Sequence, residues 1–267
     1  MICSIVAVPL LAVGLILGLA SCEPSYYRPK VFTPEQLESA AKQVEDKLVE
    51  IRNIAGETQR DRARAGASQA VEYSVTFTED ELNAFFLKWT ELSEIKGRYQ
   101  HFVRDPRVAL TPGRVFLAGR ASAGRFSGVV SCSFSPVLTA QGNLTLSGGG
   151  WSVGKLPVPA AFLDSPIERA MVSINQQLPG WRSGARVDSH GAANEAALKA
   201  VYGRLMLAAL SGRSAPGVLL VPVDRNRAIA VRLTKVLVER GQITFQGQPL
   251  TATEQARFVE ELKSSSE

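Results

Sequence analysis

The chain opens with a run of apolar residues that no charged side chain interrupts. Met1 to Cys22 carries no charged side chain, and the stretch from Ile5 to Ala20 is almost wholly aliphatic. A helix buried in a soluble core would show a polar face, which this run lacks. A membrane-spanning helix needs about 20 apolar residues, and a secretory signal needs a shorter apolar centre with small residues at the cut. The run fits both of these interpretations.

Apolar residues at helical spacing predict two helices in the next part of the chain. The first begins at Thr33-Pro34, an N-cap residue followed by proline in the first turn, and is expected to end near Gly56. The polar stretch 56–68 is interpreted as a linker. A short strand around Val75 and Phe77 then leads to a capping box, Thr78 with Glu81, that starts the second helix.

The apolar pattern changes to a period of two between residues 105 and 159, which indicates strands. Thr111-Pro112-Gly113 predicts a hairpin turn. In the clearest strand, apolar residues from Phe126 to Leu138 alternate with serines, so we expect one buried face and one that is wet or lightly covered. Three glycines at 148–150 predict strong curvature.

The C-terminal third is expected to contain a helix from about Phe162, a loop over 179–193, a helix over 195–210, three strands and a final helix over 251–262. Helices and strands come in blocks, which favours an α+β fold: a curved antiparallel sheet packed by two or more helices, with an N-terminal membrane anchor. The predicted organisation is an anchor over 1–22, a tether and amphipathic helix over 23–70, and an α+β domain over 71–267 with a helical insert near 180–215.

The end of the apolar run resembles the lipobox of bacterial lipoproteins. Its residues are Leu19-Ala20-Ser21-Cys22, and the resemblance implies a cut before Cys22 and lipid on its thiol. The alternative is an uncleaved single anchor. Either form places the protein in the cell envelope, anchored to a membrane, with its bulk on the extracytoplasmic side. Cys132 is then left without a disulfide partner and is interpreted as a small core residue.

The segment from Tyr73 to Leu178 is similar to a group of uncharacterised membrane-anchored bacterial envelope proteins. The similarity lies in a T-x-x-E-L-N helix, here Thr78 to Asn83, and in the segment from Trp151 to Leu163 that leads into another helix. It implies a helix followed by a curved sheet, and no chemistry. A long helix cradled by a curved sheet is also similar, at the level of fold only, to the tubular lipid-binding proteins.

Motifs for catalysis or metal binding are sparse. His101 and His190 have no second histidine or cysteine pair nearby, which argues against a metal site. The sequence has no nucleophile elbow, phosphate loop or dinucleotide fingerprint. A Ser-x-x-Lys match at Ser152 and Lys155 precedes a Pro-Val-Pro segment, where a helix cannot present it. We therefore expect no enzyme activity, no catalytic residues and no cofactor.

Charge is distributed unevenly around the formal net charge of +5. Basic residues outnumber acidic ones over 94–125, and ten basic residues face four acidic ones over 181–240. An exported protein seldom meets nucleic acid, so the partners we expect are anionic lipid or an acidic envelope polymer. A solvated basic face is the simpler alternative, and the sequence names no protein partner.

Two functions follow from these patterns. The first is a non-enzymatic, membrane-anchored envelope protein that binds a lipid-like or apolar ligand between helix and sheet. Its candidate ligand-lining residues are Phe85, Phe86, Trp89, Phe126, Phe134, Trp151 and Phe162. The second is a structural or scaffolding lipoprotein that contacts a partner through the 180–215 insert.

Overall fold

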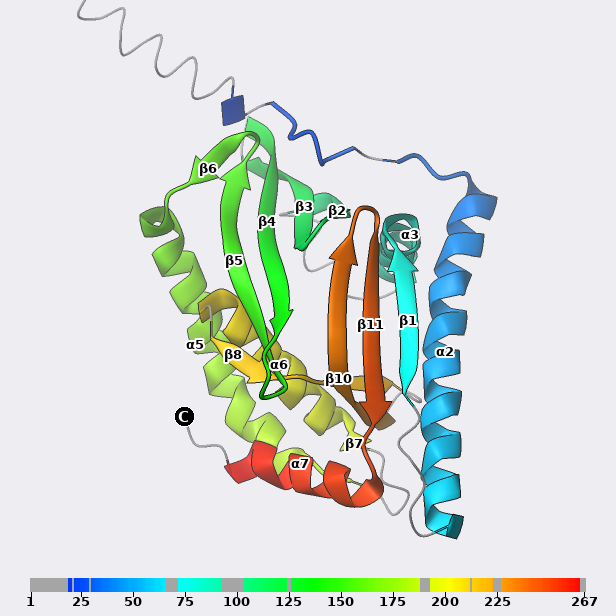
Figure 1. Cartoon of the computed structure of the whole chain (residues 1–267). Helices are drawn as coiled ribbons and strands as arrows, with labels where there is room; N and C mark the ends of the chain where they lie inside the picture. The colour runs from blue at the N-terminus through cyan, green and yellow to red at the C-terminus, as the bar shows by residue number, and fades with distance from the viewer. Residues whose placement is uncertain are drawn as a thin grey trace, which may run out of the picture.

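Two antiparallel sheets with helices on their outer sides make up the computed structural model of the chain (Figure 1). The structure describes residues 19–20, 22–28, 30–65, 72–92, 103–123, 126–187, 193–211, 213–222 and 227–264. The predicted α+β class is confirmed. The expected single curved sheet is instead divided into two sheets.

The first sheet combines a strand from the N-terminal half with the C-terminal hairpin. β11 lies between β1 and β10, and β10 also pairs with β9 and β7. The strands are β1 (Tyr73–Thr78), β7 (Ala193–Asn194), β9 (Val218–Pro222), β10 (Arg227–Glu239) and β11 (Gln242–Pro249).

The second sheet is a meander in which consecutive strands pair, with one strand added late in the chain. Its order is β2-β3-β4-β5-β6, and β8 pairs with β5. The strands are β2 (Val103–Thr111), β3 (Arg114–Ala123), β4 (Phe126–Leu138), β5 (Asn143–Val153), β6 (Leu156–Val158) and β8 (Ser214–Pro216). The predicted hairpin between β2 and β3 is confirmed, with Gly113 at a φ of 71°.

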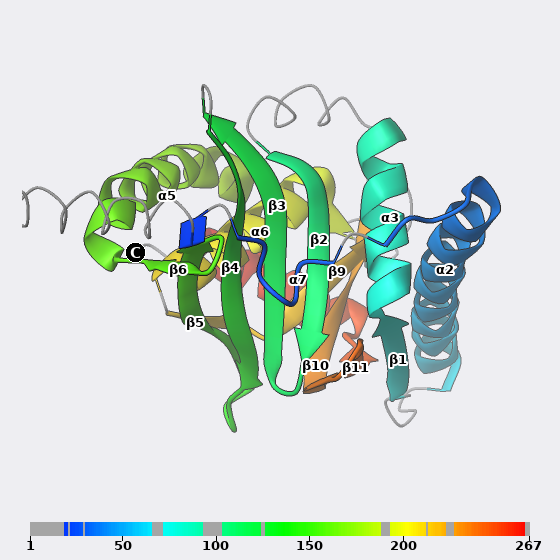
Figure 2. The ribbon, with the colours of Figure 1, turned by 90° about the horizontal axis from the view of Figure 1, so that it is seen from above.

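The helices form two groups at the sides of the sheets (Figures 1 and 2). α2 and α3 pack together beside β1, whereas α5, α6 and α7 pack on one another at the other side. Their bounds are α2 (Pro34–Ala65), α3 (Glu79–Leu92), α5 (Ala160–Gly184), α6 (Glu195–Ser211) and α7 (Ala252–Ser264). Among the described residues, no helix is long and apolar enough to cross a membrane.

The two sheets meet where the tips of two hairpins exchange backbone hydrogen bonds. Gly113 N–H donates to the carbonyl of Val238 at 2.8 Å, and Gly241 N–H donates to the carbonyl of Leu110 at 3.0 Å. Apolar residues of both sheets, among them Leu110 and Val238, belong to one core cluster that α2 and α3 cover. The sheets therefore share one core at this corner and position each other.

The T-x-x-E-L-N motif joins α3 to its neighbours. Thr78 and Glu81 form the predicted capping box, with hydrogen bonds of 2.8 and 3.2 Å between each backbone N–H and the other side chain. Lys47 of α2 binds both carboxylate oxygens of Glu81, at 2.6 and 2.7 Å. The amide of Asn83 bonds to both the N–H and the carbonyl of Val108 in β2. The motif is thus a structural joint between α2, α3, β1 and β2.

Residues 22–28 and 30–33, here called the strap, lie across the second sheet (Figure 2). The Tyr26 hydroxyl hydrogen-bonds with Ser131 on β4, Glu23 pairs with Arg120 on β3, and the Tyr27 hydroxyl donates to the carbonyl of Asp105 on β2. The Tyr27 side chain is buried. The segment interpreted as a tether is thus, over these residues, a packed part of the fold.

Two helices extend beyond their predicted ends. α2 continues past Gly56 to Ala65, through part of the predicted linker, because this stretch is rich in Glu, Gln, Arg and Ala, which favour helix. α5 continues through Pro179 to Gly184, into the predicted loop. There Trp181 of α5 packs so closely on Gly203 of α6 that a Cβ on Gly203 would lie 2.9 Å from the indole. This packing offsets the cost of proline in a helix interior.

The serine face of β4 is more covered than its pattern predicts. Ser131 is 3% exposed and Val129, on the same face, is 1% exposed. The expectation of a wet or lightly covered face is wrong at these positions; at Ser131, Tyr26 of the strap lies on the hydroxyl. Residues that are distant in sequence determine this burial, so alternation within the strand alone does not reveal it.

Candidate ligand-binding site

An open cavity of about 300 Å³ lies between α5, α6 and the start of β8. Its lining residues are Met171, Asn175, Leu178, Arg182, Arg204, Leu207, Ala208, Arg213, Ser214 and Ala215. The volume is at the lower end of the range of about 300–1,000 Å³ that is usual for pockets that bind drug-sized ligands. A small organic ligand therefore fits the cavity.

Among the described residues of this lining, the charged side chains are all arginines. Arg182 comes from α5, Arg204 from α6 and Arg213 from the residue before β8. None of the described residues that line the cavity carries a carboxylate. Arginine presents a planar guanidinium that binds a carboxylate or a phosphate through two parallel hydrogen bonds. The lining is therefore suited to an anion.

The rest of the lining is mostly apolar. Met171 and Leu178 come from α5, and Leu207 and Ala208 from α6. Asn175 and Ser214 are the neutral polar residues of the lining. An apolar wall beside cationic groups suits a ligand that has both an anionic group and a hydrocarbon part.

Packing of α5 on α6 holds this cavity in place. The contact of Trp181 with Gly203 sets a close approach of the two helices, and a Cβ on Gly184 would lie 3.2 Å from Ala196. Leu178 is buried in the same contact region. β8 closes one side, because Ser214 and Ala215 pair with Thr145 and Leu144 of β5.

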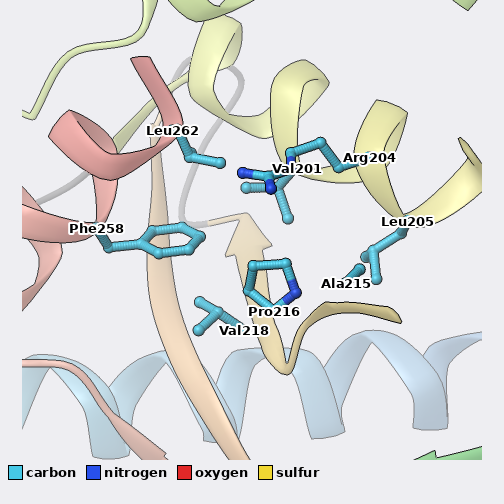
Figure 3. Close-up of a pocket in the computed structure, with 8 residues that line it drawn as sticks. All are labelled: Val201, Arg204, Leu205, Ala215, Pro216, Val218, Phe258 and Leu262. Carbon is cyan, nitrogen blue, oxygen red and sulfur yellow. The ribbon is translucent and has the colours of Figure 1, made fainter. Parts of the chain in front are cut away.

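The adjoining face of α6, which shares Arg204 with this cavity, is closed. Arg204 also borders a space of only about 10 Å³ between α6, α7, β8 and β9, lined mainly by apolar side chains such as Phe258 and Leu262 (Figure 3). A space of that size holds one water molecule at most. The side of α6 that faces α7 is therefore packed core, and the ligand-sized space lies on the side that faces α5.

The four predicted ligand-lining aromatic residues whose side chains are described do not all line one site. Phe85, Phe86 and Phe134 pack against the core cluster shared by the two sheets. Trp151 lines a different pocket, of about 200 Å³, beside the strap. The side chains of Trp89, Phe126 and Phe162 lie outside the described residues. Three of the seven are thus in one core cluster and a fourth is elsewhere.

The Ser-x-x-Lys match lies at the pocket beside the strap. Ser152 and Lys155 both line it, although no helix carries them. The Ser152 hydroxyl is 2.6 Å from the Ser131 hydroxyl and 3.2 Å from the Tyr26 hydroxyl. Within the described residues, the hydrogen-bond partners of Ser152 are thus other hydroxyls.

The two described cysteines differ in environment. Cys22, the predicted lipidation site, is exposed at the start of the strap, and residues 1–18 lie outside the described residues. Cys132 is half-buried, and burial raises the pKa of its thiol. Neither His101 nor His190 is described, and the described residues contain no group of three metal-ligating side chains.

The sequence patterns did not single out Arg182, Arg204 or Arg213. The excess of basic residues over 181–240 was the only signal, and it covers these three together with basic residues that lie elsewhere. The three arginines come together because α5 continues past Pro179 to Gly184 and packs on α6 there. The sequence patterns predicted a loop over 179–193 and therefore did not place Arg182 on this helix.

Comparison with known proteins adds no family. No family model, no curated protein sequence and no solved structure matches the chain. The resemblance to the envelope-protein group therefore stays a prediction.

Proposed function

We propose that the chain is a non-enzymatic, membrane-anchored envelope protein that binds an anionic amphiphile in the cavity between α5 and α6. One observation carries the proposal: three arginines and an apolar wall line the same space of about 300 Å³. The anionic group would lie at the arginines, and the hydrocarbon part would lie along Leu178 and Leu207.

The chemistry of the lining selects for a ligand with both parts. An uncharged hydrocarbon would bring no negative charge to the guanidinium groups of the lining. A small inorganic anion would leave the apolar wall in contact with water. A fatty carboxylate satisfies both parts, since hydrogen bonds to charged groups contribute about 1.5–3 kcal/mol each and each buried methylene about 0.8 kcal/mol.

The anchoring part of the proposal is supported by the lipobox-like ending at Cys22. The thiol is exposed, as a modified cysteine requires. The strap that follows Cys22 is fastened to the sheet, so an anchor there would hold the domain close to the membrane.

The scaffolding alternative has weaker support. It requires an exposed apolar face on α6, but Ala197, Ala200 and Val201 are buried. Tyr202 is 44% exposed, and its hydroxyl donates a hydrogen bond to the carbonyl of Leu220.

Binding of dodecanoate tests the proposed site directly. The ligand is titrated into the purified full chain by calorimetry, with 1-dodecanol as the uncharged comparison. We expect dodecanoate to bind and dodecanol to bind at least about tenfold more weakly, because the alcohol has no negative charge and only one oxygen to accept a hydrogen bond from guanidinium. Arg213→Gln should weaken dodecanoate binding by about 10–100-fold.

Arg257→Gln is the matched control, because Arg257 lies exposed on α7 and pairs only with Glu261 among the described residues. It should bind dodecanoate like the wild type. Equal binding of dodecanoate and dodecanol, or equal losses in Arg213→Gln and Arg257→Gln, would overturn the proposed site.

A further inference from the structure

A second pocket, of about 200 Å³, lies between the strap and the second sheet. Tyr26 of the strap forms one side, and residues of β3, β4 and β5 form the others. Its hydrogen-bonding centre is a triangle of hydroxyls from Tyr26, Ser131 and Ser152, with oxygen–oxygen distances of 2.6, 2.6 and 3.2 Å.

Two cations border this pocket. Arg114 begins β3 and Lys155 lies in the turn between β5 and β6, and both are exposed. No carboxylate occurs among the lining residues in the part of the chain that the structure describes. Neighbouring cations on this side are already paired, Arg120 with Glu23 and Lys30 with Asp80. Within the described residues, Arg114 and Lys155 have no acidic partner.

Aromatic rings also line the pocket. Tyr26 stacks on Phe116 with the ring centroids 4.4 Å apart, and Trp151 also lines the pocket. Hydroxyls, two cations and rings together suit a phosphate ester: the cations would bind the phosphate, and the hydroxyls and rings would contact the alcohol part.

The pocket lies beside residues 19–20, the first residues that the structure describes. Lys155 N–H donates to the carbonyl of Leu19 at 3.0 Å. Residues 19–20 and β6 lie at the same end of the molecule (Figure 1). If Cys22 carries lipid, as the proposed function states, this end is the one nearest the bilayer.

We infer that the pocket beside the strap binds a phosphate ester of the size of a phospholipid headgroup, with Arg114 and Lys155 as its phosphate ligands. The choice of a lipid as its source rests on the proposed anchoring. The phosphate chemistry rests on the pocket alone.

The test has a soluble arm and a membrane arm, both with the full chain. In the soluble arm, glycerol 1-phosphate is titrated into protein in neutral detergent, and binding is followed by phosphorus NMR. In the membrane arm, the protein is placed in phosphatidylcholine nanodiscs with or without phosphatidylglycerol. The rate of Lys155 acylation is then measured by mass spectrometry, with Lys263 as the internal reference.

We expect glycerol 1-phosphate to bind and Arg114→Gln to weaken this binding at least tenfold. We also expect phosphatidylglycerol to slow acylation of Lys155 several-fold, but not of Lys263, and Arg114→Gln to remove that protection. The side chains of Arg114 and Arg257 are both exposed, so Arg114→Gln and its control Arg257→Gln should unfold at the same temperature as the wild type.

Glycerol 1-phosphate binding together with protection of Lys155 by phosphatidylglycerol supports a site for a lipid headgroup. Protection of Lys155 without binding of glycerol 1-phosphate supports a headgroup site that requires the intact lipid. Binding of glycerol 1-phosphate alone supports a phosphate-ester site filled from solution. Failure of both arms, or Arg257→Gln weakening binding as much as Arg114→Gln, overturns the inference. Dodecanoate binding is scored separately on wild-type protein, so failure of this pocket and failure of the α5–α6 site give different results.

Discussion

At the scale of single residues, the polar side chains of the T-x-x-E-L-N motif act as joints. Asn83 is 4% exposed and satisfies both backbone groups of Val108. Glu81 caps its own helix and holds Lys47 of α2. These bonds explain why a motif without catalytic chemistry can have such specific residue types.

Replacing Asn83 with alanine should destabilise the fold by about 2–4 kcal/mol, because the N–H and the carbonyl of Val108 would stay buried without partners. Urea unfolding followed by circular dichroism measures the change. Asn53→Ala, at an exposed position of α2, is the control and should change the free energy of unfolding by less than about 0.5 kcal/mol. Similar losses in the two variants would contradict the assigned role of Asn83.

Tyr73 should make the protein sensitive to alkaline pH. Burial raises the pKa of its phenol above the ordinary value of 10.0. From about pH 10 upward, the unfolded chain releases this proton while the folded chain keeps it. Stability therefore falls as pH rises, by up to about 1.4 kcal/mol per pH unit from this one group.

Tyr73→Phe removes the ionisable group and keeps the ring. The free energy of unfolding, measured by urea titration between pH 8 and pH 11, should decline less steeply in this variant than in the wild type. Parallel curves would show that the Tyr73 phenol has no part in alkaline unfolding. Some decline should remain, because burial is also the main cause that raises the pKa of Tyr27.

At the scale of elements, sequence patterns predicted the features that depend on residues close together in the chain. The capping box at Thr78, the hairpin at Gly113 and the final helix all depend on neighbours in sequence, and all are present. The ends of α2 and α5 were wrong, because helix propensity beyond Gly56 and packing around Pro179 override the usual stop signals. The strap was missed because its partners lie about 75 to 125 residues away.

Gly154 offers a direct test of how the strap is fastened. Its φ is +59°, and a Cβ there would lie 2.4 Å from the carbonyl oxygen of Ala20. Gly154→Ala should therefore lower stability and loosen the start of the strap, so that trypsin cleaves faster after Lys30, the basic residue of the strap that proline does not follow. Peptide mass spectrometry during limited proteolysis measures the cleavage rate.

Gly113→Ala is the matched control. Gly113 has a similar φ of +71°, but a Cβ there would have no atom within 4 Å. The backbone strain is alike in both variants, at about 1 kcal/mol or more, and only Gly154→Ala adds the collision. Equal cleavage rates in the two variants would mean that the contact with residues 19–20 does not hold the strap.

At the scale of the whole molecule, the class of fold could be predicted from the sequence but the site could not. Blocks of strands and helices were enough to indicate α+β. The aromatic residues chosen as ligand-lining followed the apolar face of single elements, and such faces usually form core, as Phe85 and Phe134 do. The arginine cavity is assembled from three separate elements and has no local signature.

The basic excess noted over 94–125 and 181–240 also separates in space. Arg114 belongs to the pocket beside the strap, and Arg182, Arg204 and Arg213 belong to the cavity between α5 and α6. The pocket beside the strap lies near residues 19–20, where the proposed anchor joins the fold. The cavity lies between α5 and α6, on the other side of the sheets from α2 and α3. The two basic regions are therefore expected to bind different ligands.

The measurement that tests the central claim most directly is native mass spectrometry of the full chain extracted from membranes in mild detergent. We predict that the wild-type protein retains an anionic amphiphile and that Arg213→Gln loses most of it, while Arg257→Gln retains it. A wild-type protein with no such ligand, which also fails to take up added dodecanoate, would contradict the claim.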